Sequence, residues 1–175
     1  MILALGLTSA GSGLRAQPVV APEYQLKAVF LYHFAQFVEW PPGAFASPQA
    51  PLVIGVLGKD PFGAFLDQIV SGESVDHRGL RVRRYARVED VDACQILFIN
   101  PSGSSELGPI LQALKGRSIL TVGDASDFAR AGGMIGFVTA DNRIRFRINL
   151  GAAKAAHLTL SSNLLRPAEI VATEN

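Results

Sequence analysis

Residues 27 to 42 read Lys27-Ala-Val-Phe-Leu-Tyr-His-Phe-Ala-Gln-Phe-Val-Glu-Trp-Pro-Pro42. At about 100° per residue, the apolar side chains of this segment gather on one broad helical face. That face comprises Leu26, Phe30, Leu31, Phe34, Phe37 and Val38, and the polar face comprises Gln25, His33, Gln36 and Glu39, together with Val29, Tyr32 and Trp40. Pro41 and Pro42 cannot continue the backbone hydrogen bonds. We therefore expect a mostly buried helix that ends at or just before Trp40.

The composition indicates one globular domain. The 175 residues are 49% hydrophobic, which is enough for one substantial core. The formal net charge of +1 and the 18% of charged residues give no strong electrostatic field, so nucleic acid and anionic membranes are disfavoured as partners. The basic residues within 81–84 and 143–147 alternate with apolar ones, which is typical of strands with one solvent face.

The amino terminus resembles a secretory signal. An apolar run from Met1 to Leu7 precedes a zone of small residues that extends to Ala16, which predicts a signal peptide over residues 1–16 and a mature chain that begins near Gln17. No lysine or arginine precedes the apolar run, which is atypical of such signals. No other segment approaches the roughly 18 consecutive apolar residues of a membrane span. We therefore expect an exported, soluble, periplasmic protein without direct membrane insertion.

Beyond the first helix, strand-like and helix-like segments alternate. Strands are expected over residues 52–57, 80–85, 96–99, 118–122, 134–139 and 143–148, and helices over 61–70, 106–114, 126–130 and 151–157. Asn149 is placed to cap the last helix, and Ala140-Asp-Asn142 is a hairpin signal between the last two strands. This order predicts a single α/β domain over residues 23–171. Its central sheet is expected to be mixed, mostly parallel and flanked by helices, with a hairpin near the carboxyl terminus.

Several segments resemble, in their order and spacing, those of one family of small periplasmic proteins. They are Phe37-Val-Glu-Trp40-Pro41, Val53-Ile-Gly-Val-Leu57 with Gly58-Lys-Asp-Pro-Phe62, Ile119-Leu-Thr-Val-Gly-Asp124, Gly133-Met-Ile-Gly-Phe137, and Phe146-Arg-Ile-Asn-Leu150 with Ser161-Ser-Asn-Leu-Leu165. Together they are similar to the YfiR-like family from about Glu23 to Ile170. The resemblance implies an exported α/β repressor that contacts the periplasmic portion of a membrane-bound diguanylate cyclase. The chain lacks the paired cysteines of some relatives, which puts disulfide-linked or redox control in doubt.

The residue types that catalyse reactions form no recognisable active site in the sequence. The glycine spacing of residues 55–63 matches neither the P-loop nor the dinucleotide fingerprint, and the serines within residues 102–105 lack a Gly-x-Ser-x-Gly elbow. Cys94 has the surroundings of a buried strand thiol. The isolated histidines are His33, His77 and His157, and the aspartates that fit turn or cap roles are Asp124, Asp127 and Asp141. We therefore expect no enzyme activity, no metal and no cofactor.

Two hypotheses remain for the function. The first is a repressor whose partners are the periplasmic portion of a membrane-bound cyclase or sensor and a second copy of the chain, as a homodimer. Its expected contact residues are Tyr32, Gln36, Glu39 and Trp40 on the first helix, and Arg147, Asn149, Ser162 and Arg166 near the carboxyl terminus. The alternative is a periplasmic small-molecule binding module that feeds a membrane receptor or transporter. Its ligand is expected where open α/β sheets bind ligands, at the carboxyl ends of the strands, near Gly58, Lys59, Asp60 and Asp124.

Overall fold

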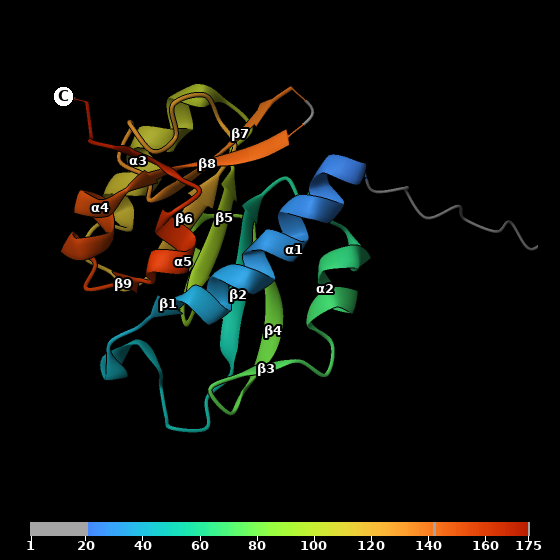
Figure 1. Ribbon diagram of the computed structural model, residues 1–175. Helices are drawn as coiled ribbons and strands as arrows, with labels where there is room; N and C mark the ends of the chain where they lie inside the picture. Colours follow the sequence, from blue (N-terminus) through green and yellow to red (C-terminus); the bar gives the residue numbers. More distant parts are fainter. Residues whose placement is uncertain (1–20, 142, 175) are drawn as a thin grey trace, which may run out of the picture.

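The structure, a computed structural model, describes residues 21–141 and 143–174 (Figure 1). The expected signal peptide over residues 1–16 and the processing site near Gln17 lie outside these residues. Within the described ranges, no helix combines the length and the apolar character that a membrane span requires.

A mixed sheet, eight-stranded over the described residues, forms the centre of the fold. Its order is β10-β8-β7-β6-β5-β2-β4-β3, with β2 at Leu52–Gly58, β3 at Ser74–Val75, β4 at Arg78–Tyr85, β5 at Ile96–Asn100, β6 at Leu120–Gly123, β7 at Ile135–Ala140, β8 at Arg143–Asn149 and β10 at Glu169–Val171. Neighbours from β4 to β7 pair in parallel, β8 is antiparallel to β7, and β10 is parallel to β8. The expected α/β class, with a mixed sheet and a late hairpin, is confirmed.

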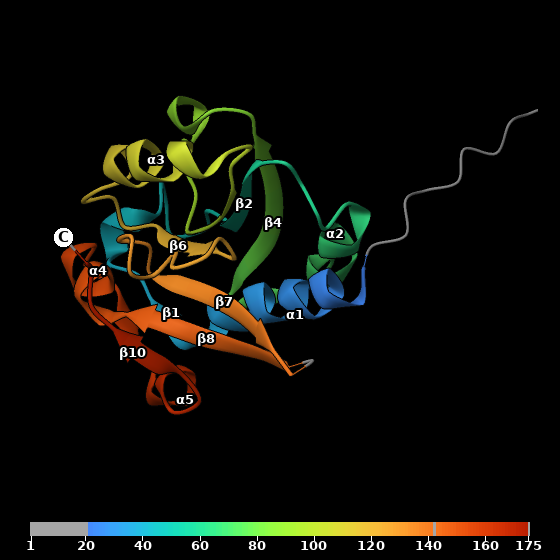
Figure 2. The same cartoon turned by 90° about the horizontal axis from the view of Figure 1, so that it is seen from above.

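Helices cover both faces of this sheet (Figure 2). One core contains side chains of α1 (Pro22–Phe37), α2 (Ala64–Val70), α4 (Leu150–Ala155) and α5 (Ser162–Leu165), and the other contains side chains of α3 (Leu107–Ala113). Ile54 and Phe98 enter the first core, whereas Leu57 and Ile99 enter the second. This division follows from the alternation of side chains along a strand. Burial on both faces explains why β2 and β5 are continuously apolar.

Short elements complete the fold. The strands β1 (Val38–Glu39) and β9 (Thr159–Leu160) pair as a separate two-stranded sheet, and the single-turn helices are η1 (Pro42–Ala44), η2 (Val88–Asp90) and η3 (Ser104–Glu106). None of the two- or three-residue strands was expected, because so few residues carry no readable periodicity. The expected cap is confirmed, since the side chain of Asn149 accepts a hydrogen bond from the N–H of Ala152 at 2.9 Å.

Helix α1 ends at Phe37, before Trp40 and the prolines, as expected. The prediction for Leu26 was wrong, because this side chain is 46% exposed, whereas Lys27 is only 2% exposed. The row that faces the sheet runs through Lys27, Leu31 and Phe34, which are spaced as one side of a helix. Leu26 falls one position outside this row. The apolar pattern alone predicted the wrong buried face in the first turn of α1, because a charged residue is buried there.

The helix expected over residues 126–130 is also wrong, because these residues form turns. Asp127 has a φ of +59°, which a right-handed helix cannot contain. The N–H of Gly133 instead donates to the carbonyl of Phe128 at 3.0 Å, which closes a turn around that buried ring.

Candidate functional site

An ionic cluster around a buried lysine joins the first turns of α1 to the carboxyl end of β6. The Nζ atom of Lys27 lies 2.7 Å from the carboxylate of Asp124 and 2.6 Å from that of Glu23. The hydroxyl of Tyr24 donates to the same oxygen of Asp124 at 3.0 Å, and the hydroxyl of Thr139 donates to Glu23 at 2.8 Å. Because two carboxylates neutralise the buried ammonium, the cluster holds α1 against the sheet.

The same contacts change the acidity of the cluster. Burial and the neighbouring carboxylate of Asp124 raise the pKa of Tyr24 to about 12. The hydrogen bond from Lys27 holds the pKa of Glu23 below its usual value. One sequence signal could have found part of this cluster, since Glu23 and Lys27 have the i, i+4 spacing of a helical ion pair.

The carboxyl ends of β2 and β5 border a hollow of about 490 Å³, and Gly58 is the predicted ligand residue that lines it. Gly58 has a φ of +87°, and a Cβ there would lie 2.3 Å from the carbonyl oxygen of Asn100. Glycine is therefore required for backbone packing at this position. Ser102 and Arg87 line the same hollow, and Val88 adds apolar surface.

The other three predicted ligand residues lie outside the lining of this hollow. Lys59 is exposed. The carboxylate of Asp60 accepts a hydrogen bond from the N–H of Phe62 at 2.7 Å and lies 2.8 Å from the guanidinium of Arg84. Asp124 belongs to the ionic cluster of α1. The two carboxylates thus have structural partners, and a ligand would have to compete with them.

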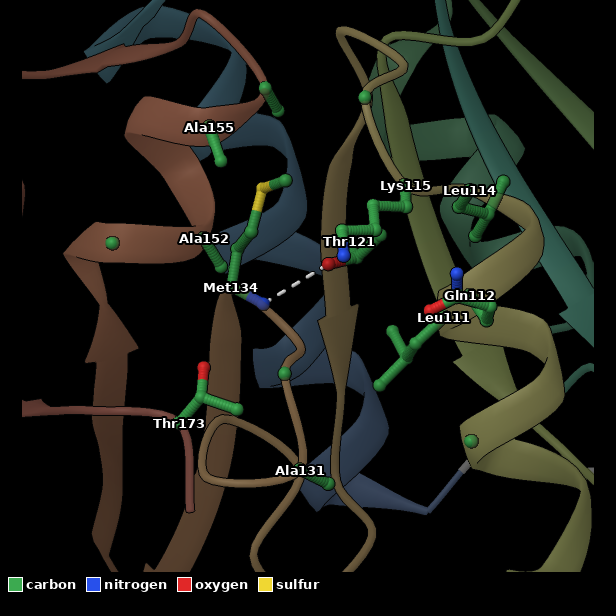
Figure 3. Close-up of a pocket in the computed structure, with 15 residues that line it drawn as sticks. Leu111, Gln112, Leu114, Lys115, Thr121, Ala131, Met134, Ala152, Ala155 and Thr173 are labelled. Carbon is green, nitrogen blue, oxygen red and sulfur yellow. Dashed lines mark hydrogen bonds between the residues drawn. The ribbon is translucent and has the colours of Figure 1, made fainter. Parts of the chain in front are cut away.

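A second hollow, of about 360 Å³, lies between α3 and α4 (Figure 3). Alanine and glycine line much of it, with Met134 and Leu111 as larger apolar side chains, and Lys115 is its only charged lining residue. The N–H of Met134 donates to the hydroxyl of Thr121 at 3.0 Å, which satisfies these polar atoms at the sheet. The small and apolar side chains of this hollow could contact an apolar ligand, but they are not arranged for catalysis.

The partner residues predicted on α1 divide into anchored and exposed ones. Tyr32 is half-buried and donates its hydroxyl to Glu73 at 3.0 Å, which raises the pKa of the phenol. Trp40 is half-buried and donates its indole N–H to the carbonyl of Gln95 at 3.1 Å. Gln36 and Glu39 are exposed. The aromatic residues therefore contribute to the fold of the monomer, whereas the two polar residues lie at the surface, where a partner could contact them.

The partner residues predicted near the carboxyl terminus divide in the same way. Asn149 is 1% exposed and donates its amide to the carbonyl of Ala129 at 2.9 Å. Arg147 lies 3.1 Å from the carboxylate of Glu169. Ser162 and Arg166 are exposed. Asn149 is thus a support beneath the surface, and the exposed residues lie on or next to α5.

Helix α5 connects the two predicted groups. The N–H of Ser161 donates to the carbonyl of Phe37 at 2.9 Å, and the antiparallel pair β1–β9 lies at the same junction (Figure 1). Gln36 and Glu39 therefore lie near the start of α5, and Arg166 follows its end. We call Gln36, Glu39, Ser162 and Arg166 the α5 surface. Sequence reasoning named these residues but could not show that one short helix joins them.

A third hollow, of about 390 Å³, adjoins the α5 surface where β10 begins, and Arg145, Arg147 and Arg166 line it. Arg147 is balanced by Glu169 and by Asp127, whose carboxylate lies 3.4 Å away. Within the described part of the chain, Arg145 and Arg166 form no ion pair. The sequence indicated Arg145 only as the solvent face of a strand, so its place beside Arg166 was missed.

Residues that could hold a metal are dispersed. Over residues 21–141 and 143–174, no three side chains of histidine, cysteine, aspartate or glutamate gather in the manner of a metal site. Cys94 is 4% exposed, and burial raises the pKa of its thiol to about 12. This thiol is poorly suited to react as a thiolate.

Comparison with known proteins gives one finding. The model of the YfiR/HmsC-like family matches residues 24–169, which is nearly all of the folded domain. No curated protein matches the chain. The family is regulatory rather than catalytic and acts on diguanylate cyclases in the periplasm. The family resemblance expected from the sequence is thus confirmed, and the chain belongs to the YfiR/HmsC-like family.

Proposed function

We propose that this protein is a periplasmic repressor that binds the periplasmic portion of a membrane-bound diguanylate cyclase and lowers cyclic di-GMP. The observation that carries the proposal is the family match over residues 24–169. The α5 surface supports it, because its side chains are exposed and polar and come from two segments that the hydrogen bond from Ser161 to Phe37 brings together. Tyr32, Trp40 and Arg147 are half-buried and Asn149 is buried, so the α5 surface does not include them.

Repression of this kind is a matter of differential affinity. A protein that binds the inactive state of its partner better than the active state shifts the partner toward inactivity. A shift from 1:99 to 99:1 requires a difference of about 5.5 kcal/mol between the two states. Several contacts must contribute, since a single surface ion pair supplies only about 0 to 1 kcal/mol.

Cellular cyclic di-GMP tests the proposal. Deletion of the gene is expected to raise cyclic di-GMP and surface attachment in cells that express the cyclase. The combined substitution Gln36→Ala, Glu39→Ala, Ser162→Ala and Arg166→Ala is expected to reproduce the deletion with the melting temperature unchanged. Arg81→Ala, an exposed change on β4, is the matched control and should repress normally. Unchanged cyclic di-GMP after deletion would refute the repressor.

The location of the protein is part of this proposal. We propose that a signal peptide over residues 1–16 is removed on export and that the mature chain begins near Gln17, in the periplasm. Amino-terminal sequencing of protein purified from the periplasmic fraction tests this directly. Recovery of an intact Met1 terminus from the cytosol would contradict it. The same sample, on a sizing column with light scattering, measures whether the chain forms the proposed homodimer.

A second candidate function is a small-molecule binding module, and the hollow beside Gly58 favours it. At about 490 Å³, this hollow has the size of a ligand site and lies at the carboxyl ends of parallel strands. Ile110→Trp would fill it with a ring from α3. Thermal melts with a panel of single amino acids, nucleotides and sugars provide the test. A compound that raises the melting temperature of the native chain but not of Ile110→Trp would support this candidate.

A further inference from the structure

Part of strand β8 has no paired strand on its outer side among the described residues. The strand runs from Arg143 to Asn149, but β10 pairs only with Arg147, Ile148 and Asn149. The outer edge of residues 143–146 is therefore open over roughly 13 Å, at about 3.3 Å per residue. Figure 2 shows β7 and β8 extending past β10 toward their turn. We call residues 143–146 the open edge.

The backbone direction along β8 indicates which groups this edge presents. The N–H of Asn149 donates to the carbonyl of Met134, on the β7 side. Because successive N–H groups of a strand point to opposite sides, those of Ile144 and Phe146 point away from β7. Ile144 thus turns both its N–H and its carbonyl toward the open edge, which is a template for another strand.

The path of the chain after α5 leaves the edge uncovered. Helix α5 ends at Leu165, and the N–H of Ala168 donates back to the carbonyl of Leu165 at 3.1 Å, so the chain turns there. Pro167 within this turn has no N–H to offer to β8. The chain joins the sheet only at Glu169, opposite Arg147. The hollow of about 390 Å³ lies at this point, beside the open edge.

The charge at the open edge is unbalanced. Arg143 and Arg145 alternate along β8 and so share one face of the sheet, and Arg166 lines the adjacent hollow with Arg145. Among residues 21–141 and 143–174, none of these three forms an ion pair. Further along the same face, by contrast, Arg147 is balanced by the carboxylates of Glu169 and Asp127.

 On this face of β8, the positive charge without an ion pair therefore lies at the open edge, with Arg166 beside it.

We propose that the open edge binds an extended, acidic segment of the partner as an added β-strand. Backbone hydrogen bonds to Ile144 and Phe146 would hold the segment, and alternate carboxylates would meet Arg143, Arg145 and Arg166. This inference rests on the proposed function, because it names how the repressor contacts its cyclase. It extends the α5 surface onto the sheet, since Arg166 belongs to that surface and lines the hollow beside the open edge.

Two synthetic octapeptides with blocked ends test the inference on the full mature chain. One alternates glutamate with valine, and the other alternates lysine with valine. The glutamate peptide is expected to bind and to shift the backbone amide resonances of Ile144 and Phe146, and the lysine peptide is not. The double change Arg145→Ser with Arg166→Ser is expected to weaken binding at least tenfold, whereas Arg81→Ser, on β4, is expected to leave it unchanged.

A further pair of changes separates strand addition from charge attraction alone. Ile144→Pro removes the outward N–H from the edge, a position where sheets tolerate proline, and is expected to abolish binding. Methylation of the backbone nitrogens of alternate peptide residues is also expected to abolish binding. Because it does not alter the protein, this test remains valid if Ile144→Pro misfolds. If the methylated peptide binds as well as the unmodified one, strand addition is wrong. Binding to phosphatidylglycerol vesicles without any response to the glutamate peptide would also overturn the inference.

The cellular assay keeps this inference distinct from the proposed function. If deletion of the gene raises cyclic di-GMP but the Arg145→Ser, Arg166→Ser protein still represses fully, the repressor stands and the open edge is not its docking site. If deletion has no effect, the proposed function fails whatever the peptides do.

Discussion

Two regions that adjoin the β7–β8 hairpin use charge in opposite ways. Beside α1, Lys27 is buried and is neutralised within hydrogen-bonding distance by Glu23 and Asp124. At the open edge of β8, Arg145 and Arg166 are exposed and form no ion pair with any described residue. The first region uses charge to hold the fold together. The second retains charge that only another molecule can neutralise.

The comparison separates residues by what their removal should affect. A buried charge that loses its partner destabilises the fold, because the remaining charge stays out of water without compensation. An exposed charge that has no partner contributes almost nothing to stability. Substitutions in the first region should therefore lower the melting temperature, and substitutions in the second should affect binding alone.

A large effect on stability is expected for Lys27→Met. This change leaves the carboxylate of Asp124 partly buried beside an apolar side chain, and loss of one partner from a buried ion pair costs about 3 to 5 kcal/mol. Urea denaturation measures the free energy of unfolding. Lys59→Met, at an exposed lysine, is the control and should change little. A loss below about 1 kcal/mol for Lys27→Met would show that the ionic cluster does not hold α1.

A smaller difference is expected between two aromatic residues of the same helical region. Phe34→Ala removes a fully buried ring, at about 3 to 5 kcal/mol. Trp40→Ala should cost less, because Trp40 is half-buried and borders the α5 surface. Thermal melts of both variants compare them. If Trp40→Ala unfolds the protein as severely as Phe34→Ala, Trp40 belongs to the core and its assignment to the partner surface is wrong.

The acidity of Tyr24 gives a test of the first region at high pH. Its pKa in the folded protein is about 12, above the ordinary value of 10.0. A raised pKa stabilises the fold while the phenol is neutral, so this contribution is complete below pH 10 and is lost as the pH rises toward 12. Melting temperatures across this range should fall less for Tyr24→Phe than for the native chain. An equal fall in melting temperature for the two proteins would show that the ionisation of Tyr24 does not report on the ionic cluster.

The residues that the sequence placed correctly depend on local information. Pro41 and Pro42 end a helix by themselves, and Asn149 caps α4 through a residue three positions away. The continuous apolar runs of β2 and β5 predicted buried strands, again from neighbouring residues alone. Each of these features can be derived from a few neighbouring residues.

The features that the sequence missed depend on distant partners. Lys27 is buried because Asp124, 97 residues away, accepts its charge, and no local pattern contains that pairing. The open edge exists because β10 begins only at Glu169, opposite Arg147 of β8, after the turn that contains Pro167.

 The register that pairs Glu169 with Arg147 could not be derived from a three-residue strand. The exposed residues of the α5 surface were predicted by type, but their grouping around one helix required the fold.

The smallest effect on stability, and the sharpest test of the comparison, is expected at two arginines of the same strand. Arg145→Ser removes a side chain without an ion pair in the described chain and should change the free energy of unfolding by less than about 0.5 kcal/mol. Arg147→Ser removes the pairs with Glu169 and Asp127 and should cost about 0.5 to 1 kcal/mol, a loss that falls at high salt.

For binding of the glutamate peptide, Arg145→Ser should have the larger effect, because Arg147 is already paired with two carboxylates of its own chain and Arg145 is not. Urea denaturation at low and high salt, combined with peptide titration, measures both orders. If Arg147→Ser weakens peptide binding more than Arg145→Ser does, an internal ion pair does not prevent an arginine from binding the peptide. The contrast between the two regions is then wrong.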